Sequence, residues 1–347
     1  MGVSFDTLGG MLDHGYDTVI DVRSPAEFAE DHVPGALNLP ALSNAERAEV
    51  GTIYVQDDPF KARKIGAALV ARNVAAHLQG PLADKDGGWR PLVYCWRGGQ
   101  RSGSFASILQ QIGWRADVVT GGYQTFRGLV HGVAYDAPVS HRLILLDGNT
   151  GTGKTDVLLR LAKLGVQVID LEGLANHRGS LLGEQAGGQP AQKAFETRVA
   201  CALASLDPDR PTLIEAESSK VGDRIIPPTL WAAMKGAPRI TIDAPLAARA
   251  AFLAEAYRDM VADQATFAAK LNILRRHRGK RVDHWLDLLA QDDVEGLAAA
   301  LMEDHYDPSY RAARARHDPQ VLHRFEVADL SQTSRQRLAE DIAATLG

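Results

Sequence analysis

PLVYCWRGGQRS, at residues 91–102, joins a short apolar segment to a cysteine, two glycines and two arginines. The apolar residues Leu92–Tyr94 predict a buried strand, and the residues from Ser102 onward predict the start of a helix. Such a strand–loop–helix arrangement points several backbone N–H groups at one spot, where the helix dipole adds partial positive charge. We therefore expect the Cys95 thiol to have a lowered pKa and to act as a nucleophile. The alternative, a buried structural cysteine, would need neither the arginines nor the glycines.

The composition sets limits on the class of protein. A chain of 347 residues predicts two domains. The net charge of −5 excludes a polycation, so any nucleic-acid surface must be a local patch. The two cysteines suggest no disulfide framework and fit a reducing cytoplasm. We find no signal peptide and no apolar run long enough to span a membrane, and we therefore expect a cytoplasmic location without a membrane partner.

Strands and helices alternate in residues 1–131, which predicts a first domain built on a parallel α/β sheet. Besides Leu92–Tyr94, we expect strands in Thr18–Arg23, His32–Pro40 and Ala116–Thr120. Ser24 is a candidate helix cap, with Pro25 at the first helical position. Ligands of such sheets bind at the carboxyl ends of the strands, which is where Cys95 lies. Arg47–Leu78 should be mostly helical, and we assign no chemical role to it.

Four separate segments of this domain resemble a rhodanese domain, in the same order. They are Asp21–Phe28, His32–Asn38, the loop that starts at Cys95, and Gly121–Tyr123. The resemblance implies that Cys95 accepts a sulfur or selenium atom. It also implies that the backbone N–H groups of residues 96–101 stabilise the resulting anion.

The Cys95 loop departs from this pattern because it is one residue longer than many rhodanese loops. The spacing from Cys95 to Arg101 and Ser102 also resembles the Cys-x5-Arg-Ser/Thr signature of cysteine phosphatases. In those enzymes the arginine binds a phosphate through two parallel hydrogen bonds. Tyr94, however, stands where those enzymes usually carry histidine. The longer loop would make room for a phosphate-bearing donor, bound by Arg97 and Arg101.

A second nucleotide- or phosphate-binding pattern follows the segment 132–141, which we expect to be a linker. The apolar strand Leu143–Asp147 leads into GNTGTGKT at 148–155 and then into a helix, the setting of a P-loop. Its glycines, Gly148, Gly151 and Gly153, allow backbone N–H groups to curl round a phosphate. Lys154 would reach the outer phosphates, and the Thr155 hydroxyl would ligate Mg²⁺ if the metal is used. We expect a P-loop kinase-like α/β domain over 142–347 and no tightly bound cofactor.

Further strands are expected at Val166–Asp170, Pro211–Glu217 and Arg239–Asp243. Glu215 or Glu217 would hold a metal-bound water, unless both are surface acids at a strand end. A glycine-rich segment after Asp170 contains His177 and Arg178, which would bind phosphate or substrate, unless this is an ordinary solvated loop. Cys201 should lie on a helix, with its side chain in the apolar core.

The region from about 246 to 347 is expected to be helical. Within it, Lys270–Arg281 has no acidic residue, and this local positive patch suits the phosphate backbone of a nucleic acid. The alternative is a solvated helix end with Gly279 as cap. The candidate nucleic-acid contacts are Arg275, Arg276, Arg278, Lys280 and Arg281.

The whole chain resembles the tRNA 2-selenouridine synthase family. The resemblance rests on the order of the two domains and on the segments Asp170–Ser180, Glu215–Ser218 and His305–Pro308. It implies an enzyme that acts on the wobble 2-thiouridine in the anticodon region of tRNA. Geranyl diphosphate would first alkylate the sulfur, and selenophosphate would then supply selenium that replaces the geranylthio group. The alternative is a P-loop NTPase or phosphotransferase fused to a sulfurtransferase or a cysteine-phosphatase-like module.

Overall fold

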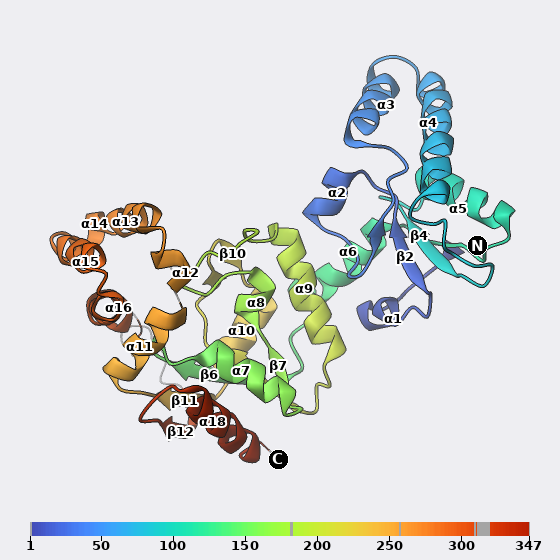
Figure 1. The fold of residues 1–347 in the computed structure, drawn as a ribbon. Coiled ribbons are helices and arrows are strands. Elements are labelled where there is room, and N and C mark those ends of the chain that lie inside the picture. The colour runs from blue at the N-terminus through green and yellow to red at the C-terminus, as the bar shows by residue number, and fades with distance from the viewer. Residues whose placement is uncertain (1, 181–182, 257, 309, 311–319, 347) are drawn as a thin grey trace. The chain divides into compact units, whose positions relative to one another are not determined.

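The computed structural model describes residues 2–180, 183–256, 258–308, 310 and 320–346. The chain forms two compact units (Figure 1). Unit 1 contains Met1–Ala137 and Pro190–Ser205, and unit 2 contains Pro138–Gln189 and Leu206–Gly347. The expected division into 1–131 and 142–347 differs from these units, because it places 190–205 in the second domain. The expected linker begins with a π-helix, η1 (Gly132–Asp136).

Unit 1 is built on a five-stranded parallel sheet with the order β1-β5-β4-β2-β3. The expected strands are all present, and β4 lies in the middle of the sheet. The strands are β1 (Gly2–Val3), β2 (Thr18–Asp21), β3 (Leu37–Asn38), β4 (Pro91–Tyr94) and β5 (Asp117–Val119). The helices are α1 (Leu8–Leu12), α2 (Pro25–Glu30), α3 (Asn44–Gln56), α4 (Pro59–Gln79), α5 (Gln100–Ile112), α6 (Tyr123–His131) and α9 (Gln192–Ser205).

Strand β4 is buried on both faces, as is typical of parallel sheets. Val93 packs on one face with Phe105 of α5, while Leu92 and Tyr94 pack on the other with Phe126 of α6. Helix α2 begins with the expected capping box, in which Ser24 precedes Pro25. These contacts fix the end of β4, and therefore the position of Cys95.

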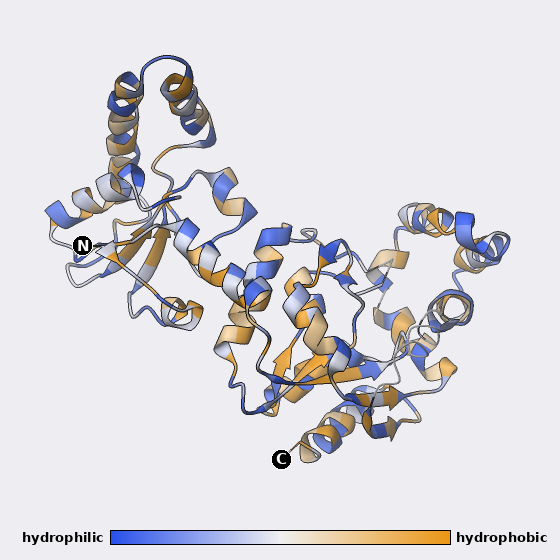
Figure 2. Cartoon of the chain, turned by 180° about the vertical axis from the view of Figure 1, so that it is seen from behind, coloured by the Kyte–Doolittle hydropathy of each residue, from blue (hydrophilic) through white to orange (hydrophobic). Residues whose placement is uncertain are grey.

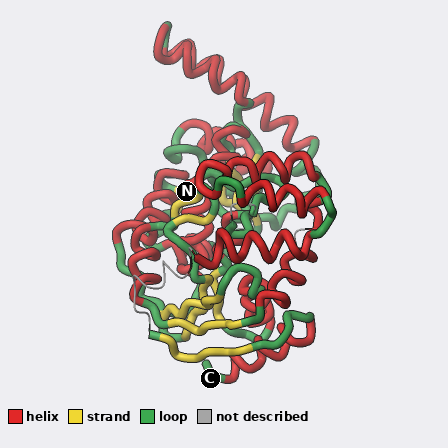
Figure 3. Tube along the Cα trace, turned by 90° about the vertical axis from the view of Figure 1, so that its left-hand side faces the viewer, coloured by secondary structure: helices red, strands yellow, loops and turns green. Residues whose placement is uncertain are grey.

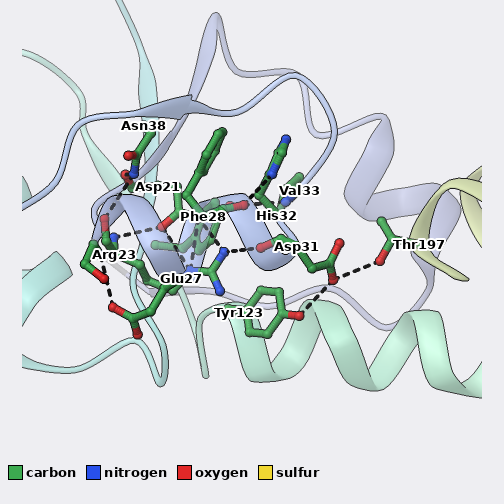
Figure 4. Close-up of polar contacts among 12 residues, drawn as sticks. Asp21, Arg23, Glu27, Phe28, Asp31, His32, Val33, Asn38, Tyr123 and Thr197 are labelled. Carbon is green, nitrogen blue, oxygen red and sulfur yellow. Dashed lines mark hydrogen bonds and ion pairs between the residues drawn. The ribbon is translucent and has the colours of Figure 1, made fainter. Parts of the chain in front are cut away.

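Helix α9 packs on unit 1 through apolar and buried polar contacts. The Asp31 carboxylate accepts hydrogen bonds from the Tyr123 hydroxyl at 2.8 Å and the Thr197 hydroxyl of α9 at 2.9 Å (Figure 4). Arg127 of α6 forms an ion pair with Glu196 of α9. The helix also carries Cys201, which packs against the apolar core as expected. Burial, together with the nearby Asp31, raises the pKa of this thiol to about 12.

Unit 2 has a second five-stranded parallel sheet, with the order β12-β11-β6-β8-β7. Figure 3 shows its strands in yellow, side by side. They are β6 (Arg142–Gly148), β7 (Gln167–Ile169), β8 (Pro211–Glu215), β11 (Arg239–Asp243) and β12 (Val321–Glu326). Helices are α7 (Lys154–Lys163), α8 (Leu171–Ala175), α10 (Pro228–Gly236), α11 (Leu246–Ala256), α12 (Arg258–Val261), α13 (Gln264–Ile273), α14 (Arg275–Arg278), α15 (Arg281–Ala290), α16 (Val294–Leu301), the π-helix η2 (Met302–Tyr306) and α18 (Gln332–Ala344). A short hairpin joins β9 (Lys220–Val221) to β10 (Arg224–Ile225).

The expectation of a helical region over 246–347 is wrong at β12. This strand extends the sheet by pairing in parallel with β11. It lies at the sheet edge with mostly exposed side chains, so it lacks the apolar run that would identify a buried strand. Among the described residues, no helix is both long and apolar enough to cross a membrane.

Candidate active sites

The first candidate site is the loop between β4 and α5. Cys95 is only 4% exposed, and its sulfur accepts hydrogen bonds from the Gly99 N–H at 3.3 Å and the Ser102 hydroxyl at 3.1 Å. The Cys95 carbonyl accepts a hydrogen bond from the Tyr123 N–H at 2.8 Å. A Cβ atom at Gly122 would collide with that carbonyl oxygen, so only glycine allows this turn to lie against the cysteine loop.

Hydrogen bonding makes the Cys95 thiol more acidic than an ordinary cysteine. Burial by itself raises the pKa of Cys95, because the charged thiolate loses its water. The hydrogen bonds from Ser102 and Gly99 and the charge of Arg101 outweigh burial, so the pKa lies below its usual value. The expectation of an activated thiol at this strand end thus has a physical basis in the structure.

The two arginines of the loop have different surroundings. Arg101 is held by Glu27 of α2, with its guanidinium nitrogens 2.8 and 3.3 Å from the carboxylate. Burial raises the pKa of Glu27, but Arg101 and the Ser24 amide lower it to below the ordinary value. Arg97 is exposed. A phosphate-bearing donor at Cys95 would therefore compete with Glu27 for Arg101, whereas Arg97 is available from solvent.

The second candidate site is the P-loop between β6 and α7. Gly151 and Gly153 have φ values of 85° and 71°, which L side chains rarely adopt. A Cβ at Gly148 would lie 2.5 Å from the Thr152 hydroxyl, so this position also requires glycine. The loop therefore has the curled backbone that the sequence pattern predicts, with its amides at the N-terminus of α7.

Lys154 lies in a buried, charged environment at the start of α7. Its ammonium donates to the Gly148 carbonyl at 3.0 Å and lies 5.5 Å from the centre of the Tyr310 ring. Burial lowers the pKa of Lys154, but Tyr310 and the carboxylates of Glu217 and Glu172 outweigh it, so the pKa is above its ordinary value. The ammonium therefore stays charged and is available to an anionic ligand.

A pair of half-buried carboxylates lies beside this lysine. Glu172 of α8 accepts a hydrogen bond from the Thr155 hydroxyl at 2.7 Å and is hydrogen-bonded to Glu217. Burial and the charge of Glu172 raise the pKa of Glu217 to about 8, although Lys154 opposes them. At neutral pH the Glu172–Glu217 pair therefore holds a proton. The Gly179 backbone packs directly against this pair, because a Cβ atom at Gly179 would lie only 2.8 Å from Glu217 Oε1.

These groups line a cavity of about 480 Å³ in unit 2. Of the expected substrate residues, Arg178 and Glu217 line it, together with Gly151, Gly153, Lys154 and Thr155 of the P-loop. His177 and Glu215 do not line it. His177 is buried against Gly222, and Glu215 accepts a hydrogen bond from the Leu171 N–H at 2.6 Å, so each has a packing role there.

The oxygen atoms of Thr155, Glu172 and Glu217 are of the kind that Mg²⁺ prefers. Their arrangement at a P-loop suits an ion that is held partly by a bound phosphate. Within the described ranges, no group of three or more His, Cys, Asp and Glu side chains is placed to hold a metal by itself.

Most arginines of the expected tRNA segment contact acidic or polar neighbours. Arg275 forms an ion pair with Asp283, and Arg281 with Asp304. Arg278 donates to the His305 ring at 3.0 Å, and His305 lines the P-loop cavity. Arg276 and Lys280 are exposed, and Gly279 caps α14 with a φ of 56°. The segment thus combines a helix cap with an exposed basic surface.

Comparison with known proteins identifies the family. Sequence models described as a rhodanese-like domain and as the tRNA 2-selenouridine synthase AAA domain match residues 4–128 and 141–276. The tRNA 2-selenouridine synthase of Pseudomonas syringae pv. syringae is 33% identical over 85% of this chain and 88% of its own. This chain belongs to the tRNA 2-selenouridine synthase family. The synthase of Cupriavidus necator is 32% identical over 93% of this chain and 95% of its own.

Sequence reasoning missed several residues of the second site in this member of the synthase family. Glu172, His305, Tyr306 and Tyr310 line the cavity but were absent from the expected site residues. A local signal exists for Glu172, because it lies in the first turn of α8, just after the carboxyl end of β7, where parallel sheets place their ligands. The other three come from distant segments, and only the folded chain brings them to the P-loop.

The contacts of Cys95 predict that Ser102→Ala will raise the pKa of the thiol. The substitution removes the shortest hydrogen bond to the sulfur, so the thiolate will form at higher pH. The measurement is the rate of Cys95 alkylation by iodoacetamide as a function of pH, followed by peptide mass spectrometry.

Ser104→Ala is the matched control, because Ser104 is exposed on the same helix. It should leave the alkylation profile unchanged. An unshifted profile for Ser102→Ala would contradict the role given to this hydrogen bond.

Proposed function

We propose that this chain is a tRNA-modifying transferase that converts wobble 2-thiouridine to 2-selenouridine in the anticodon region. The reaction would use geranyl diphosphate in a first step and selenophosphate in a second, with an S-geranyl intermediate between them. The tRNA-linked names of the relatives support an enzyme acting on tRNA. A cytoplasmic setting, where tRNA is found, is part of the proposal.

The observation that carries the geranyl step is a second, apolar cavity that adjoins the P-loop cavity. It is lined mainly by aliphatic and aromatic side chains of α11, α13 and α16, including Phe267, Leu297 and Leu301. The two cavities share the lining residues Thr150, Ser180, Leu253 and Tyr306. This apolar space measures only about 30 Å³, so its side chains must move apart for a prenyl tail to enter. A phosphate-binding loop beside such an apolar lining suits a ligand with a diphosphate head and a prenyl tail.

In the first step, the sulfur of 2-thiouridine would form a bond to C1 of the geranyl group. The bond between C1 and the diphosphate oxygen breaks, diphosphate leaves with the electron pair, and the N3 proton of the base is released. Lys154 and the P-loop amides would stabilise the negative charge on diphosphate as it departs. If Mg²⁺ takes part, Thr155 and Glu172 would hold it, and it would neutralise part of the same charge.

In the second step, selenium from selenophosphate would bond to C2 of the base. The bond between C2 and sulfur breaks and geranylthiol leaves, while water cleaves the selenium–phosphorus bond to give phosphate. The acidic Cys95 thiol and its loop amides would act in this step. Arg97 would bind the phosphate group of the donor, and Arg101 would do so after exchanging its contact with Glu27.

The direct test incubates the purified chain with 2-thiouridine tRNA and geranyl diphosphate, followed by mass analysis of the nucleosides. A geranylated nucleoside supports the proposal. Absence of that product together with rapid ATP turnover would instead favour an NTPase or phosphotransferase joined to a sulfurtransferase module.

The proposal assigns the geranyl step to unit 2 and the selenium step to unit 1. It therefore predicts that Cys95→Ala abolishes selenation but retains geranylation. The substitution removes the acidic thiol of unit 1 and leaves the P-loop of unit 2 intact. Both products are measured on the same tRNA, with selenophosphate added in a second incubation. Loss of both steps would show that the two chemistries are not separate.

Lys154→Ala should abolish geranyl transfer, because the leaving diphosphate loses its principal cation. A loss of about 10²-fold or more in rate is expected for removing such a group. Alkylation of Cys95 in the same variant, measured against pH, serves as the control for intact folding of unit 1. Geranyl transfer at the normal rate would show that the P-loop serves another ligand.

Filling the apolar cavity should weaken binding of the prenyl tail selectively. Ala254 lines this cavity and is partly exposed on α11, so the ring introduced by Ala254→Phe would compete with the tail for the space. We expect the KM for geranyl diphosphate to rise about tenfold, while inorganic diphosphate inhibits as before. Ala251→Phe, on the exposed side of the same helix, should change neither value. Equal effects of the two variants would place the tail elsewhere.

A further inference from the structure

A helical hairpin of unit 1 has no part in either site described above. Helices α3 and α4 lie side by side and project from the parallel sheet, joined by Asp57 and Asp58 (Figure 1). Their inner faces pack closely, with Val50 of α3 against Gly66 of α4. At the opposite end, Asn73 donates to the Ala41 carbonyl at 3.0 Å and so anchors α4 to the body of the unit.

The free end of this hairpin exposes large apolar side chains. Val55 is 82% exposed, Phe60 66% and Tyr54 54%. Three such residues within seven positions, next to a turn, form a local apolar patch in a chain whose remaining large apolar residues are mostly buried. Patches of this kind commonly mark sites of interaction.

The same end carries the three cations Lys61, Arg63 and Lys64 and the two carboxylates Asp57 and Asp58, and so a net charge of +1. Helix α4 contains Lys61, Arg63, Lys64 and Arg72 and no acidic residue. Lys61 forms an ion pair with Asp57, and Arg72 with Glu46. Arg63 and Lys64 are exposed and form no ion pair with any residue that the structure describes. Figure 2 shows hydrophilic and hydrophobic residues mixed along the two helices.

We propose that this hairpin end is a second RNA-binding surface, separate from the basic segment 270–281. We define the hairpin tip as Tyr54, Val55, Phe60, Lys61, Arg63 and Lys64. RNA offers both features that the tip requires: flat apolar base faces that stack on aromatic rings, and phosphates that neutralise unpaired cations. Pairing of two copies of the chain through this tip is the alternative outcome that the test below distinguishes.

The identification of the bound RNA as tRNA rests on the proposed function. The tip would then contact unpaired nucleotides of the substrate, since bases within a helix are stacked on one another and unavailable to the rings. The exposed tip side chains are free to do this without any change in the core of unit 1.

The test measures binding of the full-length chain to tRNA by fluorescence anisotropy over a range of salt concentrations. Phe60→Ala and Tyr54→Ala should each weaken binding about 5- to 150-fold, the range for loss of one base–aromatic stack. Arg63→Gln with Lys64→Gln should reduce the slope of log affinity against log salt by roughly 0.7 per charge removed.

Matched controls separate the tip from general surface effects. Ile112→Ala removes an exposed apolar side chain elsewhere in unit 1, and Lys163→Gln with Lys235→Gln removes two exposed cations of unit 2. These variants should bind tRNA like the parent chain. All tip residues are exposed, so circular dichroism should show unchanged folding in every tip variant.

The outcome also distinguishes this proposal from the proposed function. Tip variants that bind tRNA as tightly as the parent chain would overturn the tip proposal, even when geranylation proceeds. Tip variants that instead lower the mass measured by sedimentation would show that the tip joins copies of the chain. Tight, tip-dependent binding of RNA without any geranylated product would leave the tip proposal standing and reject the proposed function.

Discussion

Both candidate sites begin where an interior strand of a parallel sheet ends and the chain turns into a helix. Strand β4 leads into the Cys95 loop, and β6 leads into the P-loop. In each case a helix starts within a few residues, so the free amides at its first turn face the same point. The two loops therefore share one electrostatic feature, backbone N–H groups arranged in a way that suits an anion, although their side chains differ.

The side chains then decide what each loop does with an anion. Around Cys95, Ser102 and Gly99 hydrogen-bond to the sulfur and favour its negative form. Around Lys154, two half-buried carboxylates lie so close together that they hold a proton between them. The first arrangement favours a nucleophile, and the second favours a permanently charged lysine beside a group that can exchange a proton.

Sequence patterns identified the structural elements whose residues are continuous in sequence. They missed the residues and strands whose positions depend on contacts between distant segments. The strand, loop and helix around Cys95 and the P-loop at 148–155 are continuous in sequence, and both were predicted with their architecture. Tyr310 is more than 150 residues from Lys154, and no local pattern places it over that ammonium. Strand β12 was missed because an edge strand with exposed side chains has no buried apolar run. The apolar residues of a helix such as α9 likewise indicate that it packs against another element. They do not indicate which of the two sheets that element belongs to.

The placement of α9 has a consequence for synthesis of the chain. Leu8 and Met11 of α1 belong to the same apolar face of unit 1 as Ala200 of α9, and Asp31 needs Thr197 of α9 as a hydrogen-bond donor. A nascent chain that has emerged only to residue 137 therefore lacks one layer of unit 1. The ribosome must first deliver β6, α7 and β7, which belong to the other unit, before residue 205 completes the first. Folding of the two units is thus interleaved in time, and cutting the chain at 137 would produce an N-terminal fragment with an open apolar face.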